Sequence, residues 1–283
     1  MSYRALAVVL AGLLLGACTP ARQQEFAAVY GAGSTQLIVA TGSPGELGLL
    51  KVIAEEFSRE NDARVLWRKA GTGESLELLR DRQVDVIMVH APSGEKQTVS
   101  EGWAAHRTLI GSNEFFLVGP ADDPAQARSA TSIVEAYQRI AKSRAKFFSR
   151  ADNSGTHQKE MAVWQRAGIA PAGDWYVCTH DFMMATLLRA DAEHGYFLTD
   201  SSTWVAGKNR LHNLSVLFKG DPFIVNVYHA YCQPAGATAE SALAARFVDF
   251  LASEKAQQII RDYGKDRYGE GLYSDAKYAR RFE

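Results

Sequence analysis

This sequence has few cysteines and almost no net charge. Its 283 residues include three cysteines, and neither a CxxC pair nor the Cys/His spacing of a metal site occurs. The formal net charge is −1, so the basic surface typical of nucleic-acid-binding proteins is not indicated. Low-complexity tracts and convincing internal repeats are lacking as well. The chain is long enough for one large or two modest globular domains.

Long hydrophobic runs are also scarce, and the exception lies at the N-terminus. Residues 5–17 are apolar or small and follow the positive charge of Arg4, but the run is too short to cross a bilayer as a stop-transfer helix. It ends in LGAC, and small residues before a cysteine resemble a bacterial lipobox. We therefore expect a signal peptide over residues 1–17, cleavage before Cys18, acylation of its thiol and a tether over residues 18–33. The alternative is an ordinary signal peptide in which Cys18 has no role.

The other two cysteines are Cys178 and Cys232. An exported compartment permits a disulfide between them. The sequence does not show whether their Cα atoms are close enough to be bridged, so a disulfide and two buried free thiols stay open as alternatives.

Short apolar runs alternate with amphipathic stretches along the rest of the chain. The expected strands lie at residues 36–41, 63–70, 84–92, 114–120, 146–150, 195–200 and 214–220. The expected helices lie at residues 44–61, 73–82, 155–167 and 244–264. This alternation predicts an α/β fold of mainly parallel sheets with helices on both faces, and the chain length predicts two such sheets.

Ligands of open α/β sheets bind beyond the carboxyl ends of the strands, so the loops at these ends are candidate sites. The sequence has four such loops of similar composition: TGSPGE (41–46), AGTGES (70–75), RADNSGTH (150–157) and TDSSTW (199–204). Helix N-termini offer unpaired N–H groups, glycine allows close approach of a ligand, and hydroxyls add neutral donors. Together they predict an anion site, to which Arg150 would add one positive charge.

Each loop taken alone also has a purely structural interpretation. Ser43 and Glu46 match a capping box with Ser43 as the N-cap, and Thr72 is expected to cap the following helix. Any of Asp152, Asn153 and Ser154 is a suitable cap for the third helix. We favour a shared anion site because four similar loops, one of them with an arginine, occur in the same chain.

Catalysis and metal binding are weakly indicated. His90 ends an expected strand and either lines the site or packs beneath a loop. Ser154 and His157 would suit a hydrolase dyad, but no G-x-S-x-G motif surrounds the serine and no group is placed to orient the base. We expect no catalytic residue, no cofactor and no protein-bound metal.

Several stretches, read in order, match a known family: ATGSPGELGLLKVIAEEF, GTGESLELLRDRQVDVIMVHAP, FFLVGPADDPA, FFSRADNSGTHQKEMAVWQRAGI, YFLTDSSTWVA, VLFKGDPFIVNVY and FVDFLASEKAQQIIRDYG. From about residue 36 to residue 272 the sequence resembles the periplasmic solute-binding proteins of ABC importers, in particular their tungstate-binding branch. The resemblance implies two α/β lobes of the type II periplasmic-binding-protein kind, joined by a two-segment hinge. Lobe I would comprise residues 34–113 and 226–283, and lobe II residues 114–225.

The resemblance also implies a ligand and partners. A tungstate ion, or molybdate, would bind between the lobes of a monomeric, membrane-anchored protein outside the cytoplasm and pass to an ABC permease. The implied contacts are Thr41, Gly42, Ser43, Thr72, Gly73, Arg150, Ser154, Gly155 and Thr156. A sensor with the same fold but no transport role is an alternative.

The sequence departs from the family pattern in two places. Gly42 stands where the first loop usually has a hydroxyl, and residues 182–184 (Phe, Met, Met) are bulkier than the usual glycine-rich stretch. Phosphate-binding proteins share the R-x-D-x-S-G-T motif, in which Asp152 would accept a phosphate proton or orient Arg150. The acid that such proteins usually carry after the strand at residues 84–92 is His90 here, which favours a fully deprotonated oxyanion. Phosphate and other small anions stay open as alternatives.

Overall fold

The computed structural model describes residues 26–283, apart from the side chains of residues 92 and 93. The predicted signal peptide, Cys18 and residues 18–25 of the predicted tether therefore lie outside the described residues. Residues 28–30 of that predicted tether form strand β1, which pairs with β3 and so belongs to the folded domain. The strands are β1 (Ala28–Tyr30), β2 (Thr35–Thr41), β3 (Ala63–Lys69), β4 (Val86–Val89), β5 (Ala105–Pro120), β6 (Phe147–Ser149), β7 (Tyr176–Cys178), β8 (Tyr196–Asp200), β9 (Leu214–Phe218), β10 (Val225–Cys232) and β11 (Ser274–Asp275). The helices are α1 (Ser43–Glu46), α2 (Leu49–Glu60), α3 (Thr72–Arg80), α4 (Pro92–Ser100), α5 (Ile133–Ser143), α6 (Gly155–Arg166), α7 (Met183–Ala192), α8 (Ser201–Gly207), α9 (Ser241–Ala252), α10 (Glu254–Asp262), α11 (Lys265–Tyr268) and α12 (Ala276–Ala279).

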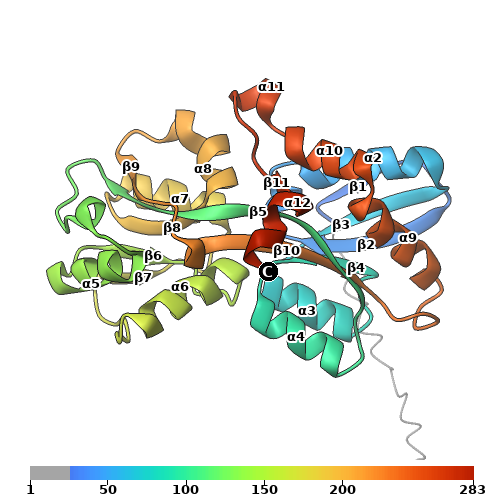
Figure 1. Ribbon diagram of the computed structural model, residues 1–283, viewed down its shortest axis with the longest axis horizontal. Helices are drawn as coiled ribbons and strands as arrows, with labels where there is room; N and C mark the ends of the chain where they lie inside the picture. The colour runs from blue at the N-terminus through green and yellow to red at the C-terminus, as the bar shows by residue number, and fades with distance from the viewer. Residues whose placement is uncertain (1–25) are drawn as a thin grey trace, which may run out of the picture.

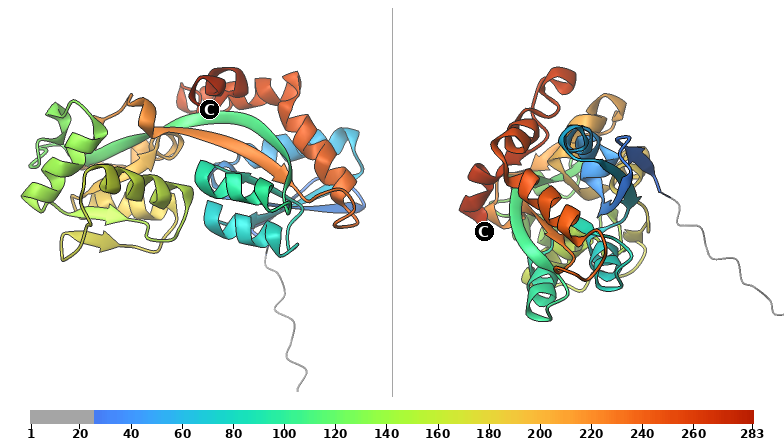
Figure 2. Two further views of the ribbon diagram at one scale, coloured as in Figure 1. Left: turned by 60° about the horizontal axis from the view of Figure 1, so that its bottom comes forward. Right: turned by 90° about the vertical axis from the view of Figure 1, so that its right-hand side faces the viewer.

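The chain forms two α/β halves that share two long strands (Figure 1). We call the half built on the parallel strands β3, β2 and β4 lobe I, and the half built on the parallel strands β8, β6 and β7 lobe II. Strand β5 pairs with β10 over its first half and with β8 and β9 over its second half. Figure 2 shows β5 and β10 arching together from one lobe to the other. The predicted two-lobed α/β class is confirmed, and the connecting strands add antiparallel pairs to the parallel ones.

Separate hydrophobic clusters stabilise the two lobes. In lobe I, Phe57 and Phe247 lie in edge-to-face contact between the sheet and its helices, with ring centroids 5.0 Å apart. In lobe II, Tyr137, Phe147 and Trp164 form an equivalent aromatic centre. The half-buried side chain of Trp204 on α8 packs against both clusters. Helix α8 thus lies where the lobes meet, next to the strands that connect them (Figure 1).

Some predicted elements differ from the observed ones. The helix expected over residues 44–61 is broken at Gly48, whose φ of 90° suits glycine and interrupts the helical hydrogen bonding. The helix expected over residues 244–264 is split at Ser253, which caps α10 through a hydrogen bond from the amide of Ala256. Strand β10 was not predicted from the hydrophobic pattern, because it is almost wholly buried and does not alternate.

The two described cysteines are far apart in the fold and are not paired. Cys178 is exposed on β7 in lobe II, whereas Cys232 is buried at the end of β10. Of the two alternatives left open by the sequence, the structure shows free thiols. Among residues 26–283, every helix is too short or too polar to cross a membrane.

Candidate anion-binding site

The predicted loops come together where the two lobes face each other. Thr41 ends β2, Thr72 begins α3, and Arg150 follows β6, so each lies at the carboxyl end of a parallel strand. A Cβ atom built on Gly73 of lobe I would lie 2.6 Å from Nδ2 and 2.7 Å from the carbonyl oxygen of Asn153 in lobe II. The lobes are therefore closed on each other at these loops. In Figure 2, α3 and α4 of lobe I lie opposite α6 of lobe II.

Ser43 connects the lobes in a way that the sequence did not indicate. The predicted capping box is wrong, because Gly42 occupies the N-cap and Ser43 is already the first helical residue. Its hydroxyl instead donates to Oδ2 of Asp200 in lobe II over 3.2 Å. The neighbouring Thr41 hydroxyl donates to the carbonyl of Met88 over 3.0 Å. These hydroxyls are engaged within the protein, which leaves the backbone N–H groups of this loop as the donors for a ligand.

The second and third loops supply helix N-termini. Thr72 is the first residue of α3 and not its cap, which is Gly71, and the Thr72 hydroxyl accepts a hydrogen bond from the amide of His90 over 3.4 Å. Ser154 is the N-cap of α6 and accepts from the amide of His157 over 3.3 Å. A Cβ atom on Gly71 would lie 3.3 Å from Cβ of Ser154. The starts of α3 and α6 therefore face each other across the boundary between the lobes.

Arg150 brings a buried positive charge to this boundary. It is 4% exposed. Its Nη2 donates to Oδ2 of Asp152 over 2.5 Å, and its Nε donates to the carbonyl of Asp181 over 3.2 Å. Within the described part of the chain, its other guanidinium hydrogens have no partner. Of the two roles considered for Asp152, the structure shows the one that orients Arg150.

Three buried polar atoms in this region form no hydrogen bond of regular geometry within the described residues, although Asn226 lies close to the His90 ring and the Tyr228 hydroxyl: Oγ1 of Thr156, Nδ1 of His90 and the hydroxyl of Tyr228. Leaving a buried polar group unsatisfied costs about 1–3 kcal/mol, so such atoms mark places where a ligand would be favourable. The rings of His90 and Tyr228 lie 4.8 Å apart, and any side chain at Gly155 would collide with the His90 ring. Sequence reasoning left the role of His90 open and missed Tyr228, which lies on β10.

The imidazole of His90 is neutral at physiological pH. Burial, followed by the positive charge of Arg150, lowers its pKa to about 3. A neutral imidazole keeps one N–H donor and one acceptor, so it adds no charge to the site. Arg150 therefore remains the buried positive charge nearest the facing helix ends.

Asp200 is a second residue that sequence reasoning did not single out, although it lies in the fourth predicted loop. Its oxygens accept from the amide and hydroxyl of Thr203, from Ser43 and, over 3.4 Å, from Asn113. Burial raises the pKa of Asp200, while these hydrogen bonds and the charge of Arg150 act against the rise. With four donors around two oxygens, this carboxylate has no acceptor position left for a proton on a ligand.

Phe182 belongs to residues 182–184, which are bulkier than the family pattern, and it also contributes to the contact between the lobes. The ammonium group of Lys69 in lobe I lies 3.9 Å from the centre of the Phe182 ring in lobe II, a cation–π contact. The guanidinium of Arg150 lies 5.5 Å from the same ring. Phe182 thus covers one side of Arg150 and contacts the opposite lobe.

The pair Ser154 and His157 does not form a hydrolase dyad. The Ser154 hydroxyl accepts from the backbone amide of His157, and the imidazole Nδ1 accepts from the backbone amide of Asn153 over 3.0 Å. Both side chains therefore serve the first turn of α6. Among the described residues, no three His, Cys, Asp or Glu side chains gather as a metal site would require.

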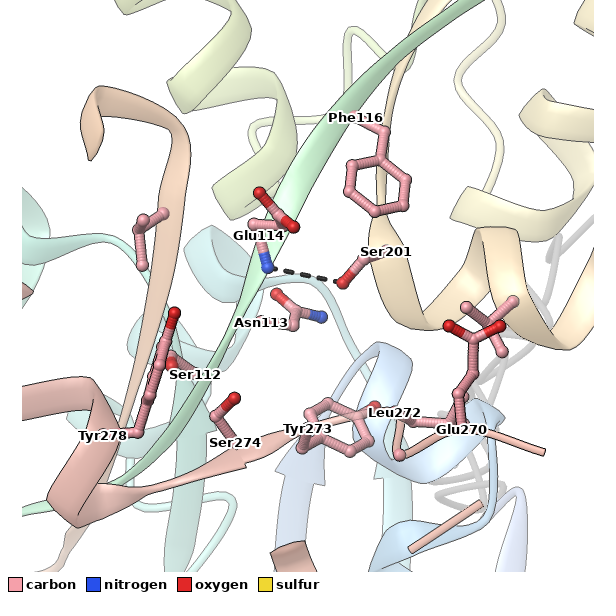
Figure 3. A pocket seen from close by; sticks show the side chains of 13 residues that line it. Ser112, Asn113, Glu114, Phe116, Ser201, Glu270, Leu272, Tyr273, Ser274 and Tyr278 are labelled. Atoms are coloured by element: carbon pink, nitrogen blue, oxygen red, sulfur yellow. Dashed lines mark hydrogen bonds between the residues drawn. The ribbon is translucent and has the colours of Figure 1, made fainter. Parts of the chain in front are cut away.

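A separate pocket of about 230 Å³ lies at the hinge and contains none of the predicted site residues (Figure 3). It is lined by Ser112, Asn113 and Glu114 of β5, by Ser201 of α8 and by Tyr273. The amide of Glu114 and the hydroxyl of Ser201 approach to 3.4 Å across it. The predicted contacts lie instead in the closed boundary between the lobes.

A buried carboxyl group beneath the site gives a testable pH dependence. Glu160 on α6 is 0% exposed, accepts from the hydroxyl of Tyr176 over 2.6 Å, and has its pKa raised by burial to about 7. Because the folded pKa lies above the unfolded one, protonation stabilises the fold at low pH, and this contribution is lost as the pH rises through about 7. Between pH 5.5 and pH 7.5 we expect the free energy of unfolding to fall by about 2 kcal/mol on account of this group.

The Glu160→Gln variant should remove this fall, because glutamine does not titrate. Urea unfolding of both proteins at several pH values measures the difference. An equally steep pH dependence in the variant would show that another group is responsible.

Comparison with known proteins agrees with this architecture. The family model of the PBP superfamily domain matches residues 28–255, so the fold is that of a periplasmic-type solute-binding protein. The tungstate-binding protein TupA of Peptoclostridium acidaminophilum is 33% identical over 275 residues, which is 95% of each chain. The chain belongs to the family of these tungstate-binding proteins.

Two solved structures support the same family assignment. The crystal structure of the tungstate ABC transporter from Geobacter sulfurreducens is 33% identical, covers 82% of this chain and 100% of that one, and has a TM-score of 0.73. The tungstate-binding protein TupA from Desulfovibrio alaskensis G20 is 32% identical, covers 86% and 99%, and has a TM-score of 0.70. Similarity at this level extends over both lobes.

Proposed function

We propose that this protein captures a fully deprotonated tetrahedral oxyanion, tungstate or molybdate, between its lobes and delivers it to an ABC permease. The observation that carries the proposal is the buried guanidinium of Arg150, placed beside unpartnered Thr156, His90 and Tyr228 atoms where the starts of α3 and α6 face each other. Helix N-termini and a buried arginine together favour a desolvated anion. The relatives named above are tungstate-binding proteins.

Each predicted residue has a role in this proposal. Arg150 supplies charge, and Asp152 holds its guanidinium in place. The N–H groups at Gly42, Ser43 and Gly73 donate from lobe I, and those at Gly155 and Thr156 donate from lobe II, with Thr41, Thr72 and Ser154 shaping the three loops. Closure of lobe I (34–113 and 226–283) on lobe II (114–225) removes water from the anion.

The charges around the site favour an anion without a proton. Asp152 is paired with Arg150, and the acceptor positions of Asp200 are filled by Ser43, Thr203 and Asn113. A hydrogen phosphate ion would bring a donor for which the site has no free carboxylate. Tungstate and molybdate bring acceptors only, which match a site made of donors.

The proposal also includes the location of the protein. Acylation of Cys18 after removal of residues 1–17 would anchor a monomer at the outer side of the cytoplasmic membrane or in the periplasm. Of the predicted tether, residues 18–33, the part before strand β1 would serve as the tether, since β1 already pairs with β3. The lobes would then reach the permease while the chain stays attached.

Calorimetric titration of the mature protein with tungstate, molybdate, phosphate and sulfate tests the function. Tight binding of tungstate or molybdate, with phosphate and sulfate inactive, is the expected result. Preferential binding of phosphate would contradict the proposed ligand. If none of the four anions binds, the proposal that the ligand is an inorganic oxyanion is wrong.

A further inference from the structure

Tyr228 belongs to β10, one of the two strands that connect the lobes, and its side chain is 3% exposed. Its hydroxyl forms no hydrogen bond of regular geometry within the described residues, although the side chains of Asn226 and Asn113 lie close to it. Two positions along the same strand, Asn226 donates to Oδ1 of Asn113 on β5 over 2.8 Å. Because residues two apart in a strand share a face, Tyr228 lies on the same face of the connecting strands as Asn226. The ring of His90, 4.8 Å from that of Tyr228, covers it from lobe I.

The surroundings of the hydroxyl place it near the anion site. The pKa of Tyr228 is raised well above its ordinary value, first by burial and then by the negative charge of Asp200, whereas the nearby side chains of Asn226 and Asn113 and the positive charge of Arg150 act in the opposite direction. The phenol therefore stays protonated and is a neutral donor at physiological pH. Asp200 in turn accepts from Ser43, so the hydroxyl lies near both a lobe I contact and the buried arginine of lobe II.

Two other tyrosines serve for comparison, because their hydroxyls are also buried and unpartnered within residues 26–283. Tyr137 lies in the aromatic core of lobe II, and its hydroxyl is influenced by Glu160 and Tyr176. Tyr273 lines the hinge pocket (Figure 3), and its pKa is raised first by burial and then by Tyr228 and Asp200. Among the described residues, Tyr228 is the one of these three tyrosines whose ring packs on His90, and the His90 ring in turn lies against Gly155 at the start of α6.

We propose that the Tyr228 hydroxyl donates a hydrogen bond to the bound oxyanion, so that the hinge strand β10 supplies a contact beside those of the two lobes. This inference rests on the proposed function, since it requires an anion at Arg150. The hydroxyl, which forms no hydrogen bond of regular geometry within the described residues, would gain a charged acceptor when the anion binds.

The test is calorimetric titration of tungstate into the mature protein and into Tyr228→Phe, with Tyr273→Phe and Tyr137→Phe as matched controls. A hydrogen bond to a charged acceptor contributes enough that Tyr228→Phe should raise the Kd about tenfold or more. The thermal midpoint of the ligand-free variant should be unchanged or higher, because the substitution removes an unsatisfied buried hydroxyl. Both controls should stay within about twofold of the wild-type Kd.

The outcomes separate this inference from the proposed function. Wild-type protein that binds none of tungstate, molybdate, phosphate and sulfate would overturn both. Wild-type protein that binds tungstate, with Tyr228→Phe binding equally well, would overturn the role of Tyr228 alone, and an equal loss in Tyr273→Phe would do the same. If Tyr228→Phe does not fold, a crystal structure of the wild-type complex with tungstate decides: a hydrogen bond from the Tyr228 hydroxyl to an anion oxygen supports the assignment, and its absence overturns it.

Discussion

Replacing Arg150 with alanine should raise the Kd for tungstate about a thousandfold, which corresponds to about 4 kcal/mol. The guanidinium is 4% exposed, so its interaction with a dianion is weakly screened by water. The substitution also frees the carboxylate of Asp152, which now neutralises part of the arginine charge over 2.5 Å. An unpaired carboxylate at this position would repel the anion. The affinity is measured by calorimetric titration of the mature variant.

Matched variants separate the charge of Arg150 from its geometry. Arg150→Lys keeps the charge but loses the planar fork, so we expect an intermediate affinity. Arg150→Ala combined with Asp152→Ala should bind more tightly than Arg150→Ala alone, because the repelling carboxylate is gone. Arg166→Ala changes the net charge equally at the far end of α6, where the guanidinium stacks on Phe223 at 3.5 Å, and should leave the Kd nearly unchanged. Equal losses in Arg166→Ala and Arg150→Ala would mean that net charge and not a direct contact is responsible.

Much of the site could be predicted because its loops carry local signals. Glycine and hydroxyl residues after a strand, followed by an amphipathic stretch, indicate a helix start, and Arg150 stands directly before one such start. The parallel strands other than β7 were predicted for a similar reason, since alternating apolar runs and amphipathic helices are local features. The family resemblance then indicated that these loops form one binding site, which the sequence of a single loop does not show.

The contacts between distant residues could not be predicted from these signals. Ser43 looked like a helix cap because SPGE fits a capping box, yet its hydroxyl bonds Asp200, which is 157 positions away. Tyr228 lies in a buried strand whose residues do not alternate, so its sequence gives no sign of a polar role. The break at Gly48 depends on a left-handed backbone conformation fixed by tertiary packing, including the Tyr263 hydroxyl that donates to the carbonyl of Leu47. Each of these features arises only after the chain has folded.

Replacing Gly73 with alanine should separate lobe closure from the folding of each lobe. In the closed structure the new Cβ would lie 2.7 Å from the carbonyl oxygen of Asn153, a backbone atom of the opposite lobe that cannot rotate away. In an open protein this contact does not exist, and alanine is a better helix former than glycine at this position in α3. We therefore expect the ligand-free protein to keep or raise its thermal midpoint, while the Kd for tungstate rises about a hundredfold or more, or about 3 kcal/mol.

Gly71→Ala is the matched control, since its Cβ would lie 3.3 Å from Cβ of Ser154 and needs only a small adjustment. Its Kd should change severalfold at most, and small-angle scattering should show it compacting with tungstate, whereas Gly73→Ala should stay extended at the same tungstate concentration. If Gly73→Ala compacts and binds like the wild type, the approach of Gly73 to Asn153 is not part of the liganded state. The anion would then bind without the full closure seen between α3 and α6. The backbone N–H groups at the starts of these two helices would in that case not both be donors to the anion.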